Sequence, residues 1–247
     1  DAGLDLVSGL HQRLASIPAL AERAAARGRR LYDVRHGEPV GIVATGRPRS
    51  GRRVLTVGTD CALGKKYTAL ALARGLADRG VAVDFRATGQ TGILIAGAGI
   101  AIDAVVSDFV AGAAERLSPS ADPAHWDVIE GQGSLFHPAY AGVALGLLHG
   151  SQPDAIVLCH DPRRTHVDGY PEQRLPGLAE AIDLHLRCGR ITSPDVCCIG
   201  ISLVTAGLTD AEADRALAAA RAETGLPAVD PLRTGIEVLL EALVRVG

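Results

Sequence analysis

The amino-acid sequence predicts an α/β protein whose parallel sheet is covered by helices on both faces, a three-layer sandwich built around an anion-binding loop. A short apolar, β-rich run over Val54–Val57 leads into a glycine-containing loop and then into a helical pattern. From there on, apolar β-rich runs alternate with helical patterns, which is typical of a parallel sheet buried on both faces. Polar and proton-transferring residues directly follow several of the predicted strands, where ligands bind in such sheets.

Residues 1–46 are predicted to be the end of a preceding domain and its linker, and residues 47–247 the main domain. Leu4–Val7 predicts a short strand, and Ser8 is predicted to cap a helix that runs to Ala26 and stops at Gly28. A second short strand is predicted around residues 31–34. The turn-rich segment 46–53 is interpreted as a linker with its four arginines on a solvated surface. Because the sequence starts at Asp1 and contains no methionine, we expect it to be part of a longer protein.

Within the main domain the elements follow one another in regular alternation. Predicted strands are 54–57, 82–87, 126–129, 155–159, 196–203 and 228–229. Predicted helices are 67–79, 103–117, 143–148, 177–186, 210–224 and 234–244. Residues 88–92 are predicted to form a loop, and the apolar run 93–100 fits neither pattern clearly.

The loop after the first strand is predicted to bind phosphate. Small residues let successive backbone N–H groups surround an anion, the following helix adds partial positive charge, and a lysine reaches the outer oxygens. The cofactor-binding residues predicted on this basis are Gly58, Thr59, Asp60, Cys61, Ala62, Leu63, Gly64, Lys65, Lys66 and Tyr67.

This loop departs from the usual G-x-x-x-x-G-K-[ST] pattern at two positions. Thr59 stands where the first glycine is expected, and Lys66 stands where a serine or threonine would bind Mg²⁺. Thr68 is a candidate substitute for that hydroxyl. We therefore predict phosphate binding and disfavour ordinary ATP or GTP hydrolysis, with a glycine-rich connector without function as the alternative.

Candidate site residues also follow the predicted strands 82–87 and 126–129. Glu130 follows the strand at 126–129, so its carboxylate is expected in the same cleft as the loop, as a metal ligand or a general base. His137 is the second candidate for the catalytic base. The other residues predicted to bind substrate in this region are Thr88, Gln90, Thr91, Gln132 and Ser134. Backbone N–H groups of 88–92 or 131–134 are candidates for an oxyanion hole.

The segment after the strand at 155–159 contains histidine, aspartate and arginine side chains. Arg164 suits bidentate pairing with a carboxylate, and His160 or His166 could relay protons, so we predict that these three residues bind substrate. Zinc binding by His160, Asp161 and His166 is conceivable, but their spacing matches no standard ligand pattern. A surface loop is the alternative, and no metal site is predicted.

Composition narrows the class of partner. A net charge of −3 and a pI near 6.3 give no electrostatic footprint for nucleic acid, and there is no basic run for an anionic membrane. The longest apolar run, 92–102, is too short to span a bilayer. Five cysteines, with no C-x-x-C pair, predict reduced thiols in the cytoplasm.

Several segments together resemble the P-loop family of DgcN-like D-glutamate N-acetyltransferases, which is related to dethiobiotin-synthetase-like P-loop proteins. The resemblance covers nearly the whole chain. Its motifs are G-T-D-C-A-L-G-K at 58–65, A-T-G-Q-T-G-I-L-I-A-G at 87–97, D-A-V-V-S-D-F-V-A-G-A at 103–113, E-G-Q-G-S-L-F-H-P-A-Y at 130–140 and G-L-L-H-G-S-Q-P-D-A at 146–155. The resemblance implies a P-loop NTPase-like fold, preceded by a Rossmann-like domain of which residues 1–45 resemble the end.

The resemblance implies transfer of an acetyl group from acetyl-CoA to the amino group of D-glutamate. It does not identify the base, for which we predict Glu130 or His137. A small-molecule acceptor and a homo-oligomer are expected. The alternative from the loop is an ATP- and Mg-dependent ligase or kinase of the dethiobiotin-synthetase type, which Lys66 disfavours. A non-catalytic module that senses a nucleotide or coenzyme A is the third hypothesis.

Overall fold

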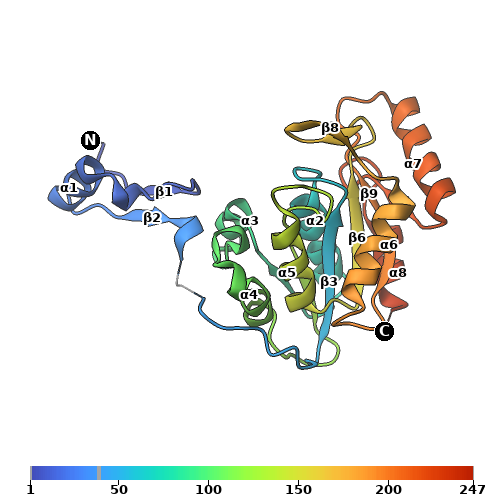
Figure 1. Cartoon of the computed structure of the whole chain (residues 1–247), viewed down its shortest axis with the longest axis horizontal. Helices are drawn as coiled ribbons and strands as arrows, with labels where there is room; N and C mark the ends of the chain where they lie inside the picture. The colour runs from blue at the N-terminus through green and yellow to red at the C-terminus, as the bar shows by residue number, and fades with distance from the viewer. Residues whose placement is uncertain (1, 38–39, 247) are drawn as a thin grey trace.

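The computed structural model describes residues 2–37 and 40–246, and it confirms the predicted α/β class. Six parallel strands form the main sheet in the order β10-β9-β6-β3-β5-β4 (Figure 1). Their bounds are β3 Arg52–Gly58, β4 Val83–Arg86, β5 Trp126–Ile129, β6 Ala155–His160, β9 Cys197–Leu203 and β10 Ala228–Val229. The phosphate loop therefore leaves a strand in the interior of the sheet, between β5 and β6.

Helices cover both faces of this sheet, so the three-layer arrangement is as predicted. Alternate residues of a strand point to opposite faces. Leu55 and Val57 of β3 pack with the helices of one face, and Val54 packs with those of the other. The first face is covered by α4 Val110–Leu117, α5 Ala141–Ser151, α6 Leu178–Gly189 and α7 Asp210–Thr224. The second face is covered by α2 Lys65–Asp78 and α8 Glu237–Val244.

The remaining elements lie at the carboxyl edge of the sheet or in the N-terminal part. Helix α3 Gln90–Ala96 follows β4, and the antiparallel hairpin of β7 His166–Val167 and β8 Tyr170–Arg174 follows β6. The N-terminal part holds a separate two-stranded parallel sheet and lies to one side of the main domain (Figure 1). It consists of β1 Leu6–Ser8, α1 Pro18–Ala26 and β2 Leu31–Asp33, with the 3-10 turns η1 Leu14–Ser16 and η2 Val34–His36.

Three predicted helices are shorter in the structure, and the one predicted over 234–244 begins only at Glu237. The N-terminal helix does not begin at Ser8, which ends β1; α1 begins at Pro18, because proline fits the first helical position, where no N–H is needed. The helix predicted over 103–117 begins only at Val110. Before it lie the 3-10 turns η3 Ile102–Ala104 and η4 Ser107–Phe109, separated by Val105 and Val106 in extended conformation.

The prediction that the arginines of 46–53 are exposed to solvent is wrong for Arg49 and Arg53. Arg53 belongs to β3 and is 3% exposed, and its guanidinium donates to Ser118 Oγ and to several backbone carbonyls. Arg49 donates to the carbonyls of Glu115, Ser118, Gly150 and Ser151. Burial lowers the pKa of Arg49 to about 10. These arginines satisfy carbonyl groups at loop and helix ends that water would otherwise reach.

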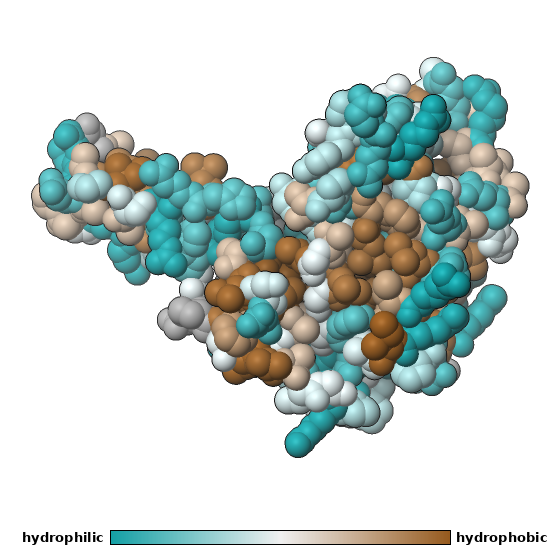
Figure 2. Space-filling view, in the orientation of Figure 1, coloured by the Kyte–Doolittle hydropathy of each residue, from teal (hydrophilic) through white to brown (hydrophobic). Residues whose placement is uncertain are grey.

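Hydrophilic and apolar residues gather on different parts of the surface. Hydrophilic residues cover the β7–β8 hairpin and much of the N-terminal part, whereas apolar residues gather over the middle of the main domain (Figure 2). Within the described ranges, 2–37 and 40–246, none of the helices has the length and apolar character needed to cross a bilayer.

Candidate functional site

The loop between β3 and α2 has the backbone conformation of an anion cradle. Ala62 and Gly64 adopt positive φ angles of 55° and 83°, which turn the chain so that α2 begins at Lys65. The first N–H groups of a helix have no intrahelical acceptor and carry partial positive charge. At Gly64 a Cβ atom would lie 2.9 Å from Val204 Cγ2, so the turn requires glycine.

Asp60 fixes the shape of this loop. Its carboxylate is fully buried and accepts hydrogen bonds from the Cys61 N–H at 2.7 Å, Arg164 Nη1 at 2.8 Å and the Asp168 N–H at 2.8 Å. Arg164 also donates to the Cys61 carbonyl at 2.8 Å. The segment that begins the β7–β8 hairpin is thereby bound to the loop.

Lys65 lies at the floor of the loop. Its side chain is buried, and Nζ donates to the Asp60 carbonyl at 2.7 Å. Burial lowers the pKa of Lys65, against the opposing influence of Asp60. A Cβ atom at Gly58 would lie 3.1 Å from Nζ, and one at Gly131 would lie 3.0 Å from Cδ. Glycine at these two positions therefore leaves room for the lysine.

Glu130 directly follows β5 and is 4% exposed. Its Oε2 accepts the N–H groups of Thr88 at 3.0 Å and Gly89 at 3.1 Å, while Oε1 accepts no hydrogen bond from the described part of the chain. Burial raises the pKa of Glu130, and the two N–H groups and the charge of Lys66 oppose that rise. A buried carboxylate with one unoccupied oxygen is suited to accept a proton.

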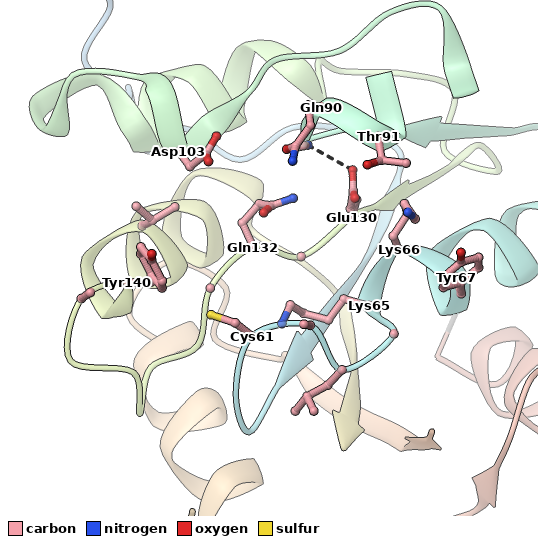
Figure 3. A pocket seen from close by; sticks show the side chains of 18 of the residues that line it. Cys61, Lys65, Lys66, Tyr67, Gln90, Thr91, Asp103, Glu130, Gln132 and Tyr140 are labelled. Carbon is pink, nitrogen blue, oxygen red and sulfur yellow. Dashed lines mark hydrogen bonds between the residues drawn. The ribbon is translucent and has the colours of Figure 1, made fainter. Parts of the chain in front are cut away.

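These groups meet in one cavity of about 700 Å³ (Figure 3). Of the residues predicted from the sequence, those that line it are Cys61, Ala62, Leu63, Gly64, Lys65, Lys66, Tyr67, Gln90, Thr91, Glu130 and Gln132. Figure 3 shows the loop with Lys65 on one side of the cavity, and Glu130, Gln90 and Gln132 on the other. The predicted meeting of three strand ends therefore takes place.

Thr88, Ser134 and His137 were also predicted as site residues but do not line the cavity themselves. Thr88 donates its hydroxyl to the Glu130 carbonyl at 2.6 Å and accepts Gln132 Nε2 at 3.1 Å. Ser134 is buried, and its Oγ accepts the Phe136 N–H. His137 is also buried and stacks on Tyr140 with ring centroids 4.4 Å apart. It lies next to the loop, with a ring nitrogen within 4.8 Å of Cys61 Sγ.

The three residues predicted to bind substrate at or after the end of β6 do not line the large cavity. Arg164 is bound to Asp60, as described above. His160 Nδ1 pairs with Thr59 Oγ1 at 2.8 Å, and its ring faces a smaller cavity together with Glu223. His166 Nδ1 pairs with Thr165 Oγ1 within the hairpin segment. A role of these residues in binding substrate stays a prediction.

Thr68 does not supply the hydroxyl that is missing at position 66. It lies two residues further along α2 and is buried, with Oγ1 donating to the Gly64 carbonyl at 3.1 Å and pairing with Ser202 Oγ at 2.8 Å. The hydroxyl is directed toward β9 and not into the cavity.

Several lining residues escaped the sequence analysis, namely His11, Asp103, Ala139, Tyr140 and Val143. Asp103 pairs with buried Arg35, whose Nε donates to the Gly9 carbonyl at 3.0 Å. The N-terminal part thus reaches the cavity wall. Nothing in the local pattern around His11 indicated this placement, whereas Tyr140 closes one of the motifs given above.

Two family models match the chain, and together they cover most of it. Residues 42–240 match the P-loop domain described as DUF1611_C, a domain of unknown function, and residues 1–37 match the Rossmann-like domain DUF1611_N. The chain belongs to the DUF1611 family. The predicted P-loop fold with a Rossmann-like N-terminal part is thereby confirmed, and the domain boundary at residue 46 stays a prediction.

Relatives of this DUF1611 chain carry an enzymatic name. A protein named D-glutamate N-acetyltransferase from Pseudoalteromonas sp is 46% identical over 98% of the chain and 73% of its own length. A protein of the same name from Tritonibacter scottomollicae is 49% identical over 100% of the chain and 74% of its own length. A crystal structure of a DUF1611 family protein from Anabaena variabilis superposes with a TM-score of 0.90 at 42% identity, covering 99% and 72% of the two chains.

Proposed function

We propose that this protein transfers the acetyl group of acetyl-CoA to the amino group of D-glutamate. The observation that carries the proposal is a single cavity in which an anion-binding loop faces the buried carboxylate of Glu130. The two relatives named D-glutamate N-acetyltransferase, at 46% and 49% identity, support D-glutamate as the acceptor and acetyl as the transferred group. Acetyl-CoA as the donor is proposed from the phosphate-binding character of the loop.

Glu130 is the proposed general base. The amino group of glutamate arrives protonated and must lose a proton before its nitrogen can attack the thioester carbonyl. Oε1 of Glu130 accepts that proton, while the N–H groups of Thr88 and Gly89 hold Oε2 in place. His137 remains the second candidate, although its ring stacks on Tyr140 and does not line the cavity.

Coenzyme A is proposed to place its phosphates on the loop. The N–H groups at the start of α2, together with Lys65 and Lys66, supply the positive charge. Tyr67 is 57% exposed at the rim of the cavity and offers a flat apolar surface to the rest of the cofactor. Cys61 lines the cavity from the loop.

The transfer forms a nitrogen–carbon bond and breaks the carbon–sulfur bond of the thioester. The predicted oxyanion donors Thr88, Gly89 and Gly131 already donate to Glu130 or to Thr56 Oγ1. We therefore assign the developing oxyanion to the side-chain amides of Gln90 and Gln132, which line the cavity beside Glu130. As the tetrahedral intermediate collapses, the nitrogen loses its second proton, and the departing thiolate of coenzyme A takes up that proton. Glu130 then releases the first proton to solvent.

The carboxylates of the acceptor are proposed to bind at the far end of the cavity. His11 and Tyr140 line the cavity and offer a ring nitrogen and a hydroxyl group for this purpose. Because Arg164 is engaged by Asp60, it is not assigned to the acceptor here. We also propose a cytoplasmic location, where the five free cysteines stay reduced, and a homo-oligomeric assembly.

One assay tests the reaction. The purified chain is mixed with acetyl-CoA and D-glutamate, and thiol release and ATP hydrolysis are followed in parallel, with L-glutamate as a second acceptor. We expect thiol release that depends on both substrates. Clear ATP turnover without thiol release would contradict the proposal and support the ligase or kinase alternative.

The variant Glu130→Gln tests the base. Glutamine keeps the shape of the side chain but cannot take the proton, so kcat is expected to fall by about 10²- to 10⁴-fold. Binding of coenzyme A, measured by calorimetry, is expected to persist. Glu180→Gln, on the exposed side of α6, is the matched control and should keep full activity. If Glu130→Gln remains active while His137→Asn does not, the base is His137.

A further inference from the structure

The cavity lacks the oxygen ligands with which phosphate loops usually hold a magnesium ion. In such sites a serine or threonine after the lysine and an acidic residue at a neighbouring strand end bind Mg²⁺. Here position 66 carries an ammonium group, and the hydroxyl of Thr68 is directed toward Ser202. The carboxylate of Asp60 is already engaged by three donors. Of the other acidic side chains among the described lining residues, Asp103 is paired with Arg35, which leaves Glu130 as the one acidic group without a cationic partner. The donor set therefore does not fit a magnesium ion.

Lys66 stands directly after Lys65, where other phosphate loops carry the hydroxyl that binds Mg²⁺. It is half-buried as the second residue of α2 and lines the same cavity as Glu130. Its Nζ lies 4.8 Å from the ring centroid of Tyr67, and none of the described carboxylates lies within 4.0 Å of it. In Figure 3 the ammonium group of Lys66 lies on the Glu130 side of the cavity, above the loop that holds Lys65.

We infer that the ammonium group of Lys66 takes the place of the divalent cation, so that the cavity binds its phosphate-bearing ligand without a metal. The inference rests on the proposed placement of the coenzyme A phosphates on the loop. It identifies the ligand class as a phosphate ester bound through tethered positive charge, and it makes Lys66 the residue that decides metal dependence.

Electrostatics explains why a cation is needed at this point. A phosphate on the loop would lie near the carboxylate of Glu130, and two negative charges in a partly buried site repel each other strongly. An ammonium group has three donors and can bind a phosphate oxygen while it faces a carboxylate. The charge of Lys66 also lowers the pKa of Glu130, against the effect of burial. Lys66 would thus serve both the ligand and the base.

Two substitutions at position 66 separate charge from coordination. Lys66→Met keeps an unbranched side chain but removes the charge, and Lys66→Thr supplies the hydroxyl that other phosphate loops use for Mg²⁺. The full chain of each variant is titrated with coenzyme A by calorimetry, once with EDTA and once with excess Mg²⁺. Arg74→Met, an exposed position on the same helix, is the control for loss of a positive charge.

For the unsubstituted chain we expect the same Kd under both conditions. Lys66→Met should bind about tenfold more weakly under both conditions, because a charge-assisted hydrogen bond is lost. Lys66→Thr should bind weakly with EDTA and recover with Mg²⁺. Arg74→Met should match the unsubstituted chain. Circular dichroism and thermal unfolding of each variant verify that it is folded.

Three results would overturn the inference. They are a requirement for Mg²⁺ in the unsubstituted chain, unchanged binding by Lys66→Met, and a Lys66→Thr variant that does not respond to Mg²⁺. ADP is used as a second probe in the same titrations, so that the result does not depend on acetyl transfer. Metal-independent binding of ADP through Lys66, without acetyl transfer, would keep the inference and reject the proposed function; absence of binding by both probes would reject the inference.

Discussion

Glu130 illustrates how the surroundings of one side chain determine its chemistry. A glutamate after a strand is compatible with a metal ligand, a base or a solvated acid. In the structure it is enclosed, one oxygen is held by two backbone N–H groups, and Gly92 leaves the space that this carboxylate occupies, since a Cβ there would lie 2.2 Å from Oε2. Burial raises its pKa and Lys66 opposes the rise.

This balance predicts the pH dependence of the reaction. The base must be unprotonated, so kcat/KM is expected to rise with pH through the pKa of Glu130, at a midpoint above the ordinary value of 4.5. Lys66→Met removes a positive charge that favours the carboxylate, so the midpoint should move to higher pH. The measurement is kcat/KM against pH for both proteins. An unmoved midpoint in the variant would show that Lys66 does not act on the base.

Arg49 and Arg53 were predicted to be exposed to solvent, but their guanidinium groups donate hydrogen bonds within the folded protein. Four arginines among glycine, proline and serine are typical of an exposed linker. Two of them instead donate to carbonyl groups at the ends of α4 and α5 and of nearby loops. The carbonyls to which Arg49 donates lie 66 to 102 residues away in the sequence, so no local pattern could reveal them.

At the scale of elements, the β7–β8 hairpin explains the position of the phosphate loop. Along the chain after β6, Arg164 precedes β7 and Asp168 follows it. The guanidinium of Arg164 and the backbone N–H of Asp168 both donate to the carboxylate of Asp60. Tyr170 of β8 packs on His137 edge to face, at 5.2 Å between ring centroids, and Gln173 donates to the Phe136 carbonyl. One short hairpin therefore contacts both the loop and the segment after β5.

The variant Arg164→Met distinguishes this structural role from the predicted binding of a carboxylate. Asp60 would lose one of its partners while staying buried, so the free energy of unfolding should fall by roughly 1–3 kcal/mol. The KM for D-glutamate should change less than about twofold, because Arg164 does not line the cavity. Urea unfolding and steady-state kinetics measure the two effects. A large rise in KM without a loss of stability would support the predicted substrate role instead.

At the scale of the whole molecule, the cavity is built by both family domains. The N-terminal part supplies His11, and it is held against the main domain through Arg35, which binds the Gly9 carbonyl and Asp103. Gly9 packs directly on Gln90, since a Cβ at Gly9 would lie 2.7 Å from Gln90 Cγ. The relative position of the two parts therefore decides the shape of the site.

The variant Arg35→Met should loosen this connection. Asp103 would lose a buried partner, so hydrogen exchange in residues 6–33 is expected to increase, and KM for the substrates should rise about tenfold. Arg30→Met removes an exposed pair with Asp5 in the same part of the chain and should have little effect. Equal behaviour of the two variants would show that Arg35 does not position the N-terminal part.

The sequence by itself determined the order of the main-sheet strands and of the helices that cover them, the phosphate loop and the position of Glu130 beside it. It did not predict α3 or the β7–β8 hairpin. Hydrophobic periodicity is local, and the carboxyl ends of parallel strands necessarily meet at one edge of the sheet. The strand at 126–129 and the helix at 210–224 have the predicted bounds for this reason. Helix starts were less certain where 3-10 turns, as before Val110, compete with the α-helix.

Only the tertiary structure decided which side chains face the cavity. It directed Thr68 to Ser202, joined Arg164 to Asp60 and brought His11 to the cavity wall. Each of these outcomes depends on a contact between residues far apart in the chain, where burial makes every polar group find a partner. The type of residue limits the chemistry that its side chain can perform, and the contacts that form on folding determine which of these roles it takes.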